Sequence, residues 1–494
     1  MSRLESFLGF PEASDKLLRM SKILFFMFPF ANITFTLSTT FYTIFVAEAL
    51  GGGDYMQGLG LLGMLVVIQM AVQTMLDYPS GAIGDWIGQR WVIASGNFFY
   101  GISFLMVSFV TSDTPFTYLA AIYALQGFAS SQISGAWGAW FDNNYKYANA
   151  SDTDRKEYGV FWGRMGMISQ IASTIALIPG SVLAAVFNRP WVFQLQFIGA
   201  TIFALLVLKL IRDFPEVEAE REGRPSMSEY FNLLRGGVSY IRYTPYVKYI
   251  IVGSCITYST ITVWGNLILF PMYFSYLITD VAVASYRTIA FIPGVFAQER
   301  SGIWSRRFEP KKWIPRFRLL QAGGFAFYLA MASVLYFFPP MSTGADLVSI
   351  MLPFTSVEIL RIPIANVLPI FLIFMVFCFT LIFGGFAEIL TQRILLDVIP
   401  NRNRNSIYSL SPTILFLFAM PQIGIYGWLI NIIGFPVTLV LCGLVSVGGV
   451  LVIRSGLAKP RPIIEEPKQE SDSKDDCSPT IPLEIDGAAL DVAE

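Results

Sequence analysis

Twelve long apolar runs follow one another along this chain of 494 residues. A helix needs about 20 apolar residues to cross a bilayer, and it satisfies its own backbone hydrogen bonds there. The runs cover residues 21–48, 55–76, 91–112, 116–142, 158–187, 190–211, 246–276, 281–299, 317–338, 366–392, 406–431 and 434–454. The sequence therefore predicts an all-α membrane protein with twelve transmembrane helices.

Composition supports a membrane protein and excludes several other classes. Only 14% of the residues are charged, whereas soluble domains average about 25%. The formal net charge of −1 gives no reason to expect a nucleic-acid partner. The chain has no histidine and four scattered cysteines, a pattern without zinc-site spacing or a disulfide framework. No nucleophile with an adjacent base is visible, so we expect neither an enzyme nor a metal or cofactor site.

The polar segments divide the chain into five parts. We expect an amphipathic cytoplasmic N-terminus at 1–20, a six-helix bundle at 21–211 and a cytoplasmic linker with one interfacial helix at 212–245. A second six-helix bundle follows at 246–454, and the acidic tail at 455–494 has the composition of a disordered segment.

The positions of lysine and arginine predict the orientation. With the N-terminus in the cytoplasm, all of the 34 basic residues fall on the cytoplasmic side except Arg164, Arg189, Arg287 and Arg361. Such an excess marks the cytoplasmic side of a membrane protein. We therefore expect a multi-pass protein of the cell membrane, surrounded by lipid, with both termini in the cytoplasm.

The short stretch between the second and third runs has an ordered set of glycines and charges. Glycines there allow a tight turn and close helix approach, and an aspartate at a helix start can accept backbone N–H groups. The residues are Asp77, Gly81, Gly84, Asp85, Gly88 and Arg90. We expect them to form the turn between two spans, with Asp85 at the start of a helix.

The spacing of Gly81, Asp85, Gly88 and Arg90 resembles the loop motif of the major facilitator superfamily, Gly-x-x-x-Asp-x-x-Gly-x-Arg/Lys. The resemblance covers about residues 20–455 and implies two pseudo-repeated six-helix bundles. It also implies a monomer, a substrate site at the midplane and a cytoplasmic latch at the motif. The span-five signature of the drug–proton antiporters is missing, since Pro179-Gly180 stands there in reverse order. Export and proton coupling therefore stay open.

Charges inside hydrocarbon are costly and indicate function. Arg287 either holds an anionic or polar substrate group or extends to the outer interface. Glu388 is either a proton carrier or a gate carboxylate paired with Arg393. We expect Arg164 to pair with Asp142 or Asp77 at the inner gate.

Four of the uncharged amides inside the predicted spans are our candidates for a substrate site. Each either lines a substrate cavity or holds two helices together by hydrogen bonds. They are Asn32, Gln126, Gln170 and Asn266.

The sequence thus predicts a secondary-active transporter that moves a small molecule by alternating access. The small molecule would be anionic if Arg287 binds it. The resemblance implies a proton gradient as the driving force. An uncoupled facilitator is one alternative. Another is a membrane sensor or partner protein with a transporter-like fold, in which the acidic tail and the linker helix would be the working surfaces.

Overall fold

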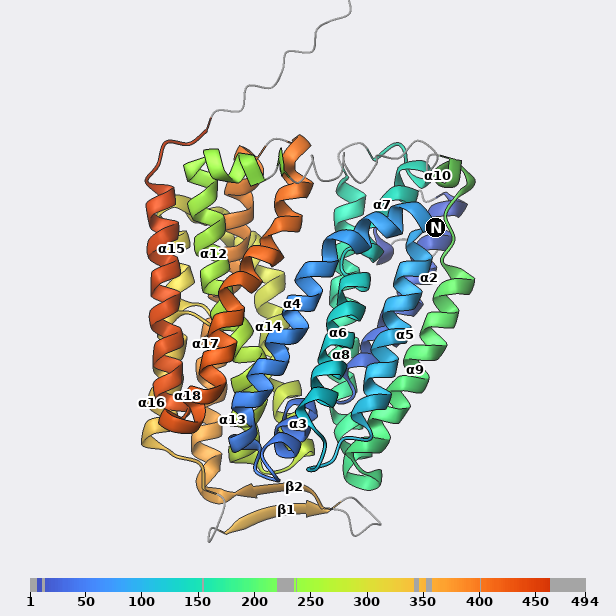
Figure 1. The fold of residues 1–494 in the computed structure, drawn as a ribbon. Helices are drawn as coiled ribbons and strands as arrows, with labels where there is room; N and C mark the ends of the chain where they lie inside the picture. The colour runs from blue at the N-terminus through green and yellow to red at the C-terminus, as the bar shows by residue number, and fades with distance from the viewer. Residues whose placement is uncertain are drawn as a thin grey trace, which may run out of the picture. The chain divides into compact units, whose positions relative to one another are not determined.

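A computed structural model describes residues 7–10, 14–152, 155–219, 235–236, 238–341, 346–351, 358–399 and 401–462. Residues Met1–Pro462 form one compact unit, in which long helices run side by side (Figure 1). One end of this unit carries an antiparallel hairpin, β1 (Leu347–Met351) and β2 (Glu358–Pro363). The opposite end carries the short helix α10 (Pro215–Ala219). We call these the hairpin end and the linker end.

The helices before residue 220 are called the N-terminal half. They are α2 (Asp15–Thr36), α3 (Tyr42–Leu50), α4 (Tyr55–Ile87), α5 (Gln89–Val107), α6 (Phe116–Ile133), α7 (Ala136–Ala148), α8 (Lys156–Phe187), α9 (Arg189–Leu210) and α10.

The helices from residue 238 onward are called the C-terminal half. They are α12 (Pro245–Val263), the π-helix η2 (Trp264–Ile268), α13 (Leu269–Leu277), α14 (Asp280–Trp304), η3 (Ser305–Arg307), α15 (Pro310–Leu320), α16 (Phe325–Phe337), η4 (Ile364–Asn366), α17 (Val367–Val398) and α18 (Asn401–Leu457). Within α18 the backbone bends at Gly434, which has φ 76°.

Every predicted span coincides with one to three of these helices. Eight helical stretches among the described residues are long and apolar enough to cross a membrane. The last of them, Leu410–Leu457, covers all but the first residues of the eleventh predicted span and the whole of the twelfth. The third and eighth predicted spans correspond to α5 and α14, and the fourth corresponds to α6 with most of α7. These helices lie outside those eight stretches.

Three spans predicted as continuous are interrupted. The first breaks between α2 and α3 at residues 37–41, the fourth at Gly135 (φ 76°) and the ninth at Gly323 (φ 80°). Glycine reaches this left-handed backbone region without steric cost, which explains the last two breaks. The first break has neither glycine nor proline, but the Thr40 hydroxyl is 2.8 Å from that of Ser181 on α8. Irregular backbone at membrane depth is tolerated where protein covers it or a cavity adjoins it.

The motif between the second and third spans forms the end of a helix, not the predicted loop. α4 continues through Asp77, Gly81 and Asp85 to Ile87, and the turn is one residue, Gly88, with φ 97°. Asp85 therefore lies at a helix end, where it accepts a hydrogen bond from Gln89 Nε2 at 3.2 Å. The expected helix-start role of Asp85 is wrong because helical hydrogen bonding persists through the glycines.

The two halves touch mainly along two helix pairs, α4 with α18 and α8 with α14. Near the hairpin end glycines allow α4 and α18 to approach closely. A Cβ added to Gly63 would lie 2.7 Å from the Ile423 carbonyl oxygen, and one added to Gly427 would lie 2.5 Å from that of Leu59. Such small residues let helix backbones meet in membranes.

Buried apolar residues form three clusters, which are distributed differently at the two ends of the molecule. The largest draws on both halves and runs from the centre to the hairpin end, with Phe41, Leu59 and Tyr276 among its members. A second cluster lies at the linker end of the N-terminal half, around Trp140. The third lies at the linker end of the C-terminal half, around Phe317. The described residues thus share one core at the hairpin end and have two separate cores at the linker end.

The outer parts of the chain depart from the predicted boundaries. Leu8 and Phe10 are fully buried, and Phe10 stacks on Phe161 at 5.3 Å between ring centroids, so part of the predicted polar N-terminus belongs to the core. The predicted linker is described only at its margins, where residues 238–243 are helical. The acidic tail beyond residue 462 lies outside the described residues.

Candidate functional site

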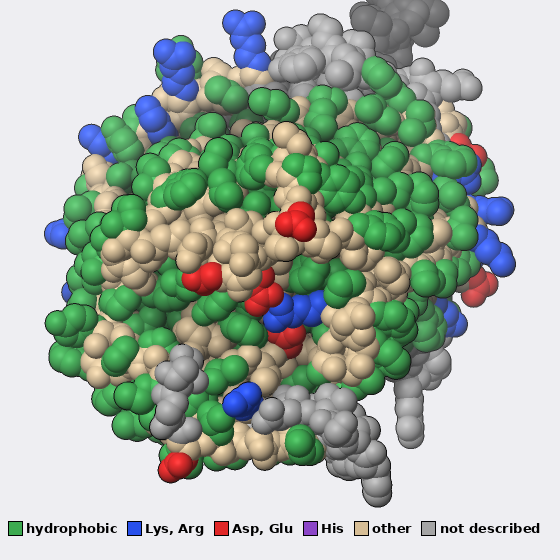
Figure 2. All heavy atoms as spheres, turned by 60° about the horizontal axis from the view of Figure 1, so that its bottom comes forward, with side chains coloured by type: hydrophobic (Ala, Val, Ile, Leu, Met, Phe, Trp, Pro, Cys, Tyr) green, Lys and Arg blue, Asp and Glu red, His purple; other side chains and the backbone are tan. Residues whose placement is uncertain are grey.

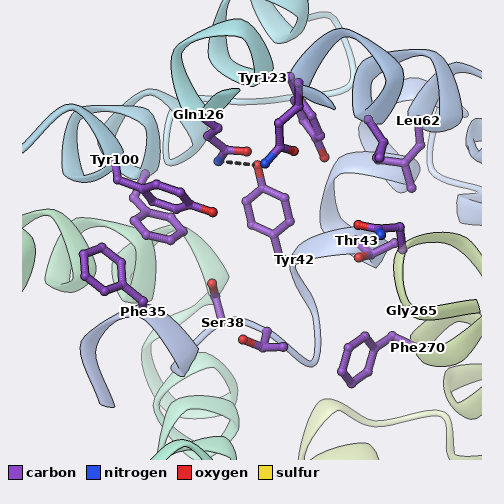
Figure 3. A pocket seen from close by; sticks show the side chains of 15 residues that line it. Phe35, Ser38, Tyr42, Thr43, Leu62, Tyr100, Tyr123, Gln126, Gly265 and Phe270 are labelled. Atoms are coloured by element: carbon purple, nitrogen blue, oxygen red, sulfur yellow. Dashed lines mark hydrogen bonds between the residues drawn. The ribbon is translucent and has the colours of Figure 1, made fainter. Parts of the chain in front are cut away.

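A pocket of about 250 Å³ lies between the two halves near their centre. The N-terminal half supplies most of its wall and the C-terminal half closes one side (Figure 3). Fifteen described residues line it: Phe35, Ser38, Thr39, Tyr42, Thr43, Leu62, Val66, Gln69, Tyr100, Phe104, Tyr123, Gln126, Gly265, Asn266 and Phe270.

Two irregular segments shape the pocket. The break in the first span places Ser38 and Thr39 at the wall, and α3 then begins with Tyr42. From the C-terminal half, the π-helix η2 presents Gly265 and Asn266. Single π-turns inside helices are frequent at functional sites. Two of the backbone irregularities of the molecule therefore lie at its central cavity.

Hydrogen bonds fix two of the predicted amides in the pocket. Gln126 Nε2 donates to the Tyr42 hydroxyl at 2.8 Å, as the dashed line in Figure 3 shows. Asn266 Nδ2 donates to the Thr262 carbonyl at 2.8 Å within its own helix. This bond uses one of the two N–H groups of the Asn266 amide and leaves its side-chain oxygen as an acceptor. The structure thus brings Gln126 and Asn266 together, although they are far apart in sequence.

A second cavity, of about 550 Å³, lies inside the N-terminal half. It shares Phe35 and Tyr100 with the central pocket and reaches Trp137 on α7, toward the linker end. The rings of Phe35 and Tyr100 meet edge to face at 5.5 Å between centroids. This aromatic pair lies where the two cavities adjoin.

The other two predicted amides lie outside the central pocket. Asn32 lines the second cavity, where its Oδ1 accepts a hydrogen bond from Ser173 on α8 at 3.0 Å. Asn32 therefore joins two helices and also borders a cavity. Gln170 lines neither cavity, and its Nε2 lies 3.4 Å from the Thr174 hydroxyl of the same helix.

Charged side chains join the two halves at the hairpin end. Arg189, the first residue of α9, donates from Nε to Asp280 Oδ2 at 2.9 Å and from Nη2 to Asp280 Oδ1 at 3.0 Å. Its Nη1 lies 2.6 Å from Glu48 Oε2 on α3. The side chains of Arg189, Glu48 and Asp280 are 18%, 30% and 12% exposed. Figure 2 shows acidic and basic side chains gathered near the middle of this face. We call these three residues the hairpin-end cluster.

A central pocket between two helical halves, which ion pairs join at one end, is typical of a membrane transporter. The family model described as Major Facilitator Superfamily matches residues 23–366. The chain belongs to the major facilitator superfamily.

Solved structures of this superfamily share the fold. The nucleoside transporter NupG, in a mutant form, is similar at 14% identity and a TM-score of 0.60, over 89% of this chain and 99% of that one. A POT family transporter in complex with 5-aminolevulinic acid is similar at 13% identity and a TM-score of 0.59, over 89% and 97%. No curated protein matches the sequence. At these identities the likeness establishes the fold, and the site must be argued from this chain.

In this superfamily member, Glu388 has a partner that the sequence did not indicate. Arg318 Nη2 lies 3.0 Å from Glu388 Oε2, and the Tyr258 hydroxyl donates to the same carboxylate oxygen. The predicted pairing with Arg393 is wrong. Arg318, which we had counted with the cytoplasmic side at the edge of the ninth predicted span, is fully buried because α15 begins at Pro310 and carries it into the bundle. We call Tyr258, Arg318 and Glu388 the C-half cluster.

Arg287 borders neither cavity, so it does not face a ligand in the pockets described. Its guanidinium carbon lies 4.2 Å from the ring centroid of Phe291 and 5.2 Å from that of Phe377. Its Nη1 is buried with no hydrogen-bond partner among the described residues. The predicted anion-reading role has no support from this placement.

At the linker end Arg164 forms no ion pair with either predicted partner, Asp142 or Asp77, among the described residues. Asp142 pairs with Arg155, and Arg164 donates to the Phe7 carbonyl. Asp77 is half-buried, and its Oδ1 accepts no hydrogen bond from a described residue. The guanidinium of Arg90 lies 5.3 Å from the ring of its neighbour Trp91. A latch at these positions remains a prediction.

Sequence reasoning missed the pocket's tyrosines and hydroxyls. The run Ser38-Thr39-Thr40 inside an apolar span was a usable signal, because three consecutive hydroxyl side chains seldom all face lipid. Tyr42 and Tyr100 gave no such signal, since aromatic residues are common in apolar spans.

Proposed function

We propose that this protein is a secondary-active transporter that moves a small molecule through the central pocket by alternating access. The observation that carries the proposal is the pocket's position between the halves. The hairpin-end cluster lies on one side of it, and the second cavity extends from it toward the linker end.

Movement would follow from loosening one end at a time. Opening the hairpin end requires the Arg189–Asp280 pair to separate and α4 to part from α18. At the linker end the apolar cores of the two halves are already separate. The halves would therefore rock about the central core, exposing the pocket alternately at either end.

The C-half cluster is our candidate for proton coupling. Glu388 is 39% exposed at its side chain while Arg318 is fully buried against it. A proton on the Glu388 carboxylate would remove its attraction for the Arg318 guanidinium. Because an unpaired buried charge is costly, protonation would favour a different helix arrangement. We further propose that the linker end lies on the cytoplasmic side of the cell membrane, because the basic residues are concentrated on that side.

Uptake into proteoliposomes tests this proposal. The full chain is reconstituted with an inward proton gradient, and the probes are radiolabelled glucose, uridine, glycylglycine, glutamate and choline. We expect at least one probe to accumulate above its external concentration. The Glu388→Gln variant should retain exchange of that probe at equal pH and lose its accumulation by about 10-fold or more, whereas the exposed control Glu309→Gln should behave as wild type.

The outcomes separate the candidate functions. Accumulation that survives Glu388→Gln contradicts the coupling role of Glu388 while leaving transport intact. Equilibration without accumulation indicates an uncoupled facilitator. If correctly folded protein takes up none of the five probes, the transport proposal fails and the sensor or partner alternative takes its place.

A further inference from the structure

The central pocket carries no charged residue. Each of the fifteen described residues that line it is apolar or bears a neutral hydroxyl or amide. This is unusual beside the rest of the molecule, where arginines and carboxylates lie deep in the helices. The pocket's neutrality restricts the substrate of the proposed transporter.

Three buried or partly buried arginines lie outside this pocket, and none of them offers it a counter-charge. Arg189 is paired with Glu48 and Asp280, and Arg318 is paired with Glu388. Arg287 is absent from the lining and packs against two phenylalanine rings. A charged ligand would therefore enter the pocket without a counter-charge, which is costly in a low-dielectric site.

Both hydrogen-bond donors and hydrogen-bond acceptors line the cavity. The Tyr42 hydroxyl accepts from Gln126 and keeps its own proton to donate. The Asn266 amide gives one N–H to the Thr262 carbonyl, which leaves its side-chain oxygen to accept and its second N–H to donate. The structure records no partner among the described residues for the Tyr100 hydroxyl or the Gln69 amide. The site thus fits a ligand that both donates and accepts at several points.

Aromatic rings and size restrict the ligand further. Phe35, Tyr100 and Phe270 give the pocket flat apolar walls, on which a ring can lie (Figure 3). Phe104 also lines the pocket. The volume of about 250 Å³ is below the ~300–1,000 Å³ typical of sites for drug-sized ligands. A single ring with hydroxyl groups, or two small rings, fills such a space.

From this geometry we infer that the substrate is a neutral, hydroxyl-bearing ring compound of monosaccharide or nucleoside size, and that the pocket rejects its charged analogues. The inference rests on the proposed function and names the substrate class of its site. The sequence had pointed instead to an anionic substrate through Arg287, so the two views differ in an outcome that can be measured.

Calorimetric titration of the purified full chain tests the inference. The probes are two neutral compounds, D-glucose and uridine, and their charged relatives glucuronate, glucosamine and uridine monophosphate. We expect at least one neutral probe to bind and its charged relatives to bind about 100-fold more weakly. Which neutral probe binds separates a sugar from a nucleoside.

Variants locate the binding and guard against misfolding. Gln126→Leu and Tyr100→Phe should each weaken binding of the neutral probe about 10-fold. The control Gln170→Leu, which replaces an amide of α8 outside the pocket, should leave it unchanged. Gln126→Glu places a carboxylate in the pocket and should raise the affinity for the cationic glucosamine relative to glucose.

Two results would overturn the inference: charged relatives that bind as tightly as their neutral parents, or a failure of both neutral probes to bind. Failure of the transport proposal looks different. In that case a neutral probe binds, the pocket variants weaken it, and proteoliposomes do not take it up. Conversely, uptake of glutamate or choline would support transport while contradicting a neutral substrate.

Discussion

The two ends of this protein hold its halves together differently. At the hairpin end Arg189 of the N-terminal half pairs in two places with Asp280 of the C-terminal half, and one apolar core spans both. At the linker end, each ion pair between described residues stays within one half, as with Arg155–Asp142 and Arg461–Asp397. The apolar cores there are separate as well.

This difference implies that separating the halves costs more free energy at the hairpin end than at the linker end. Separating the halves at the hairpin end exposes shared apolar surface and leaves partly buried charges without partners, whereas the linker-end pairs need not break at all. The structure therefore corresponds to a state with the hairpin end closed. The predictions below test this contrast, beginning with the largest expected effect.

Removing Arg189 should produce the largest change. Arg189→Ala leaves the Asp280 and Glu48 carboxylates close together and poorly solvated, which should lower stability by about 3 kcal/mol. Thermal unfolding in detergent measures the loss. The matched control is Arg155→Ala at the linker end, where the arginine side chain is 55% exposed and the expected loss is below about 1 kcal/mol.

A charge-free cluster sharpens this result. Combining Arg189→Ala with Glu48→Gln and Asp280→Asn removes the repulsion and should recover much of the lost stability, yet the ionic link between the halves stays absent. Equal losses for Arg189→Ala and Arg155→Ala would show that the two ends do not differ as described.

Gly427 should give an intermediate effect. In Gly427→Ala the new Cβ would lie 2.5 Å from the Leu59 carbonyl oxygen, so α4 and α18 must move apart at a cost of about 1–3 kcal/mol. Gly448→Ala, on the part of α18 beyond the bend at Gly434, is the control, because an added Cβ there meets nothing within 4 Å. Comparable melting temperatures for the two variants would contradict close packing of the halves at this place.

The smallest effect is expected at Lys16 and Glu216, an exposed linker-end pair 2.6 Å apart. The hydrogen bond from Lys16 lowers the pKa of the Glu216 carboxyl below its ordinary value of 4.5. A lowered pKa in the folded state means that the pair stabilises the protein above pH 4.5 and ceases to do so as the pH falls through the folded-state pKa.

Glu216→Gln should therefore lower the melting temperature slightly at pH 7, with the difference from wild type fading in acid. Melting curves measured from pH 7 down to the acid limit of the protein would show this convergence. A difference that grows as the pH falls would contradict the stated direction of the pKa shift.

The sequence predicted the spans and part of the pocket for clear physical reasons. Apolar runs of membrane length permit little besides helices. Gln126 and Asn266 were recognisable because an amide in hydrocarbon needs a partner or a cavity. The pocket's shape could not be predicted, since the break before Tyr42 involves neither glycine nor proline and depends on tertiary contacts such as Thr40 with Ser181.

Charge pairing was the least predictable feature. Arg318 stood at the edge of an apolar run, and only the helix α15, with its start at Pro310, shows that this arginine lies inside the bundle beside Glu388. Likewise, Arg189 and Asp280 are joined across the halves by the packing of α8 on α14 and of α3 on α13. Pairs between distant segments require the fold before they can be assigned.

Distances between spin labels at the two ends test the central claim most directly. In a cysteine-free background, one pair of labels at Asp113 and Ile432 spans the halves at the hairpin end, and another at Ala150 and Lys459 spans them at the linker end. Double electron–electron resonance should give one narrow hairpin-end distance in wild type, lengthened by Arg189→Ala together with a shortened linker-end distance. If Arg189→Ala leaves both distances unchanged, or lengthens both, the hairpin-end cluster is not what holds this end of the transporter closed.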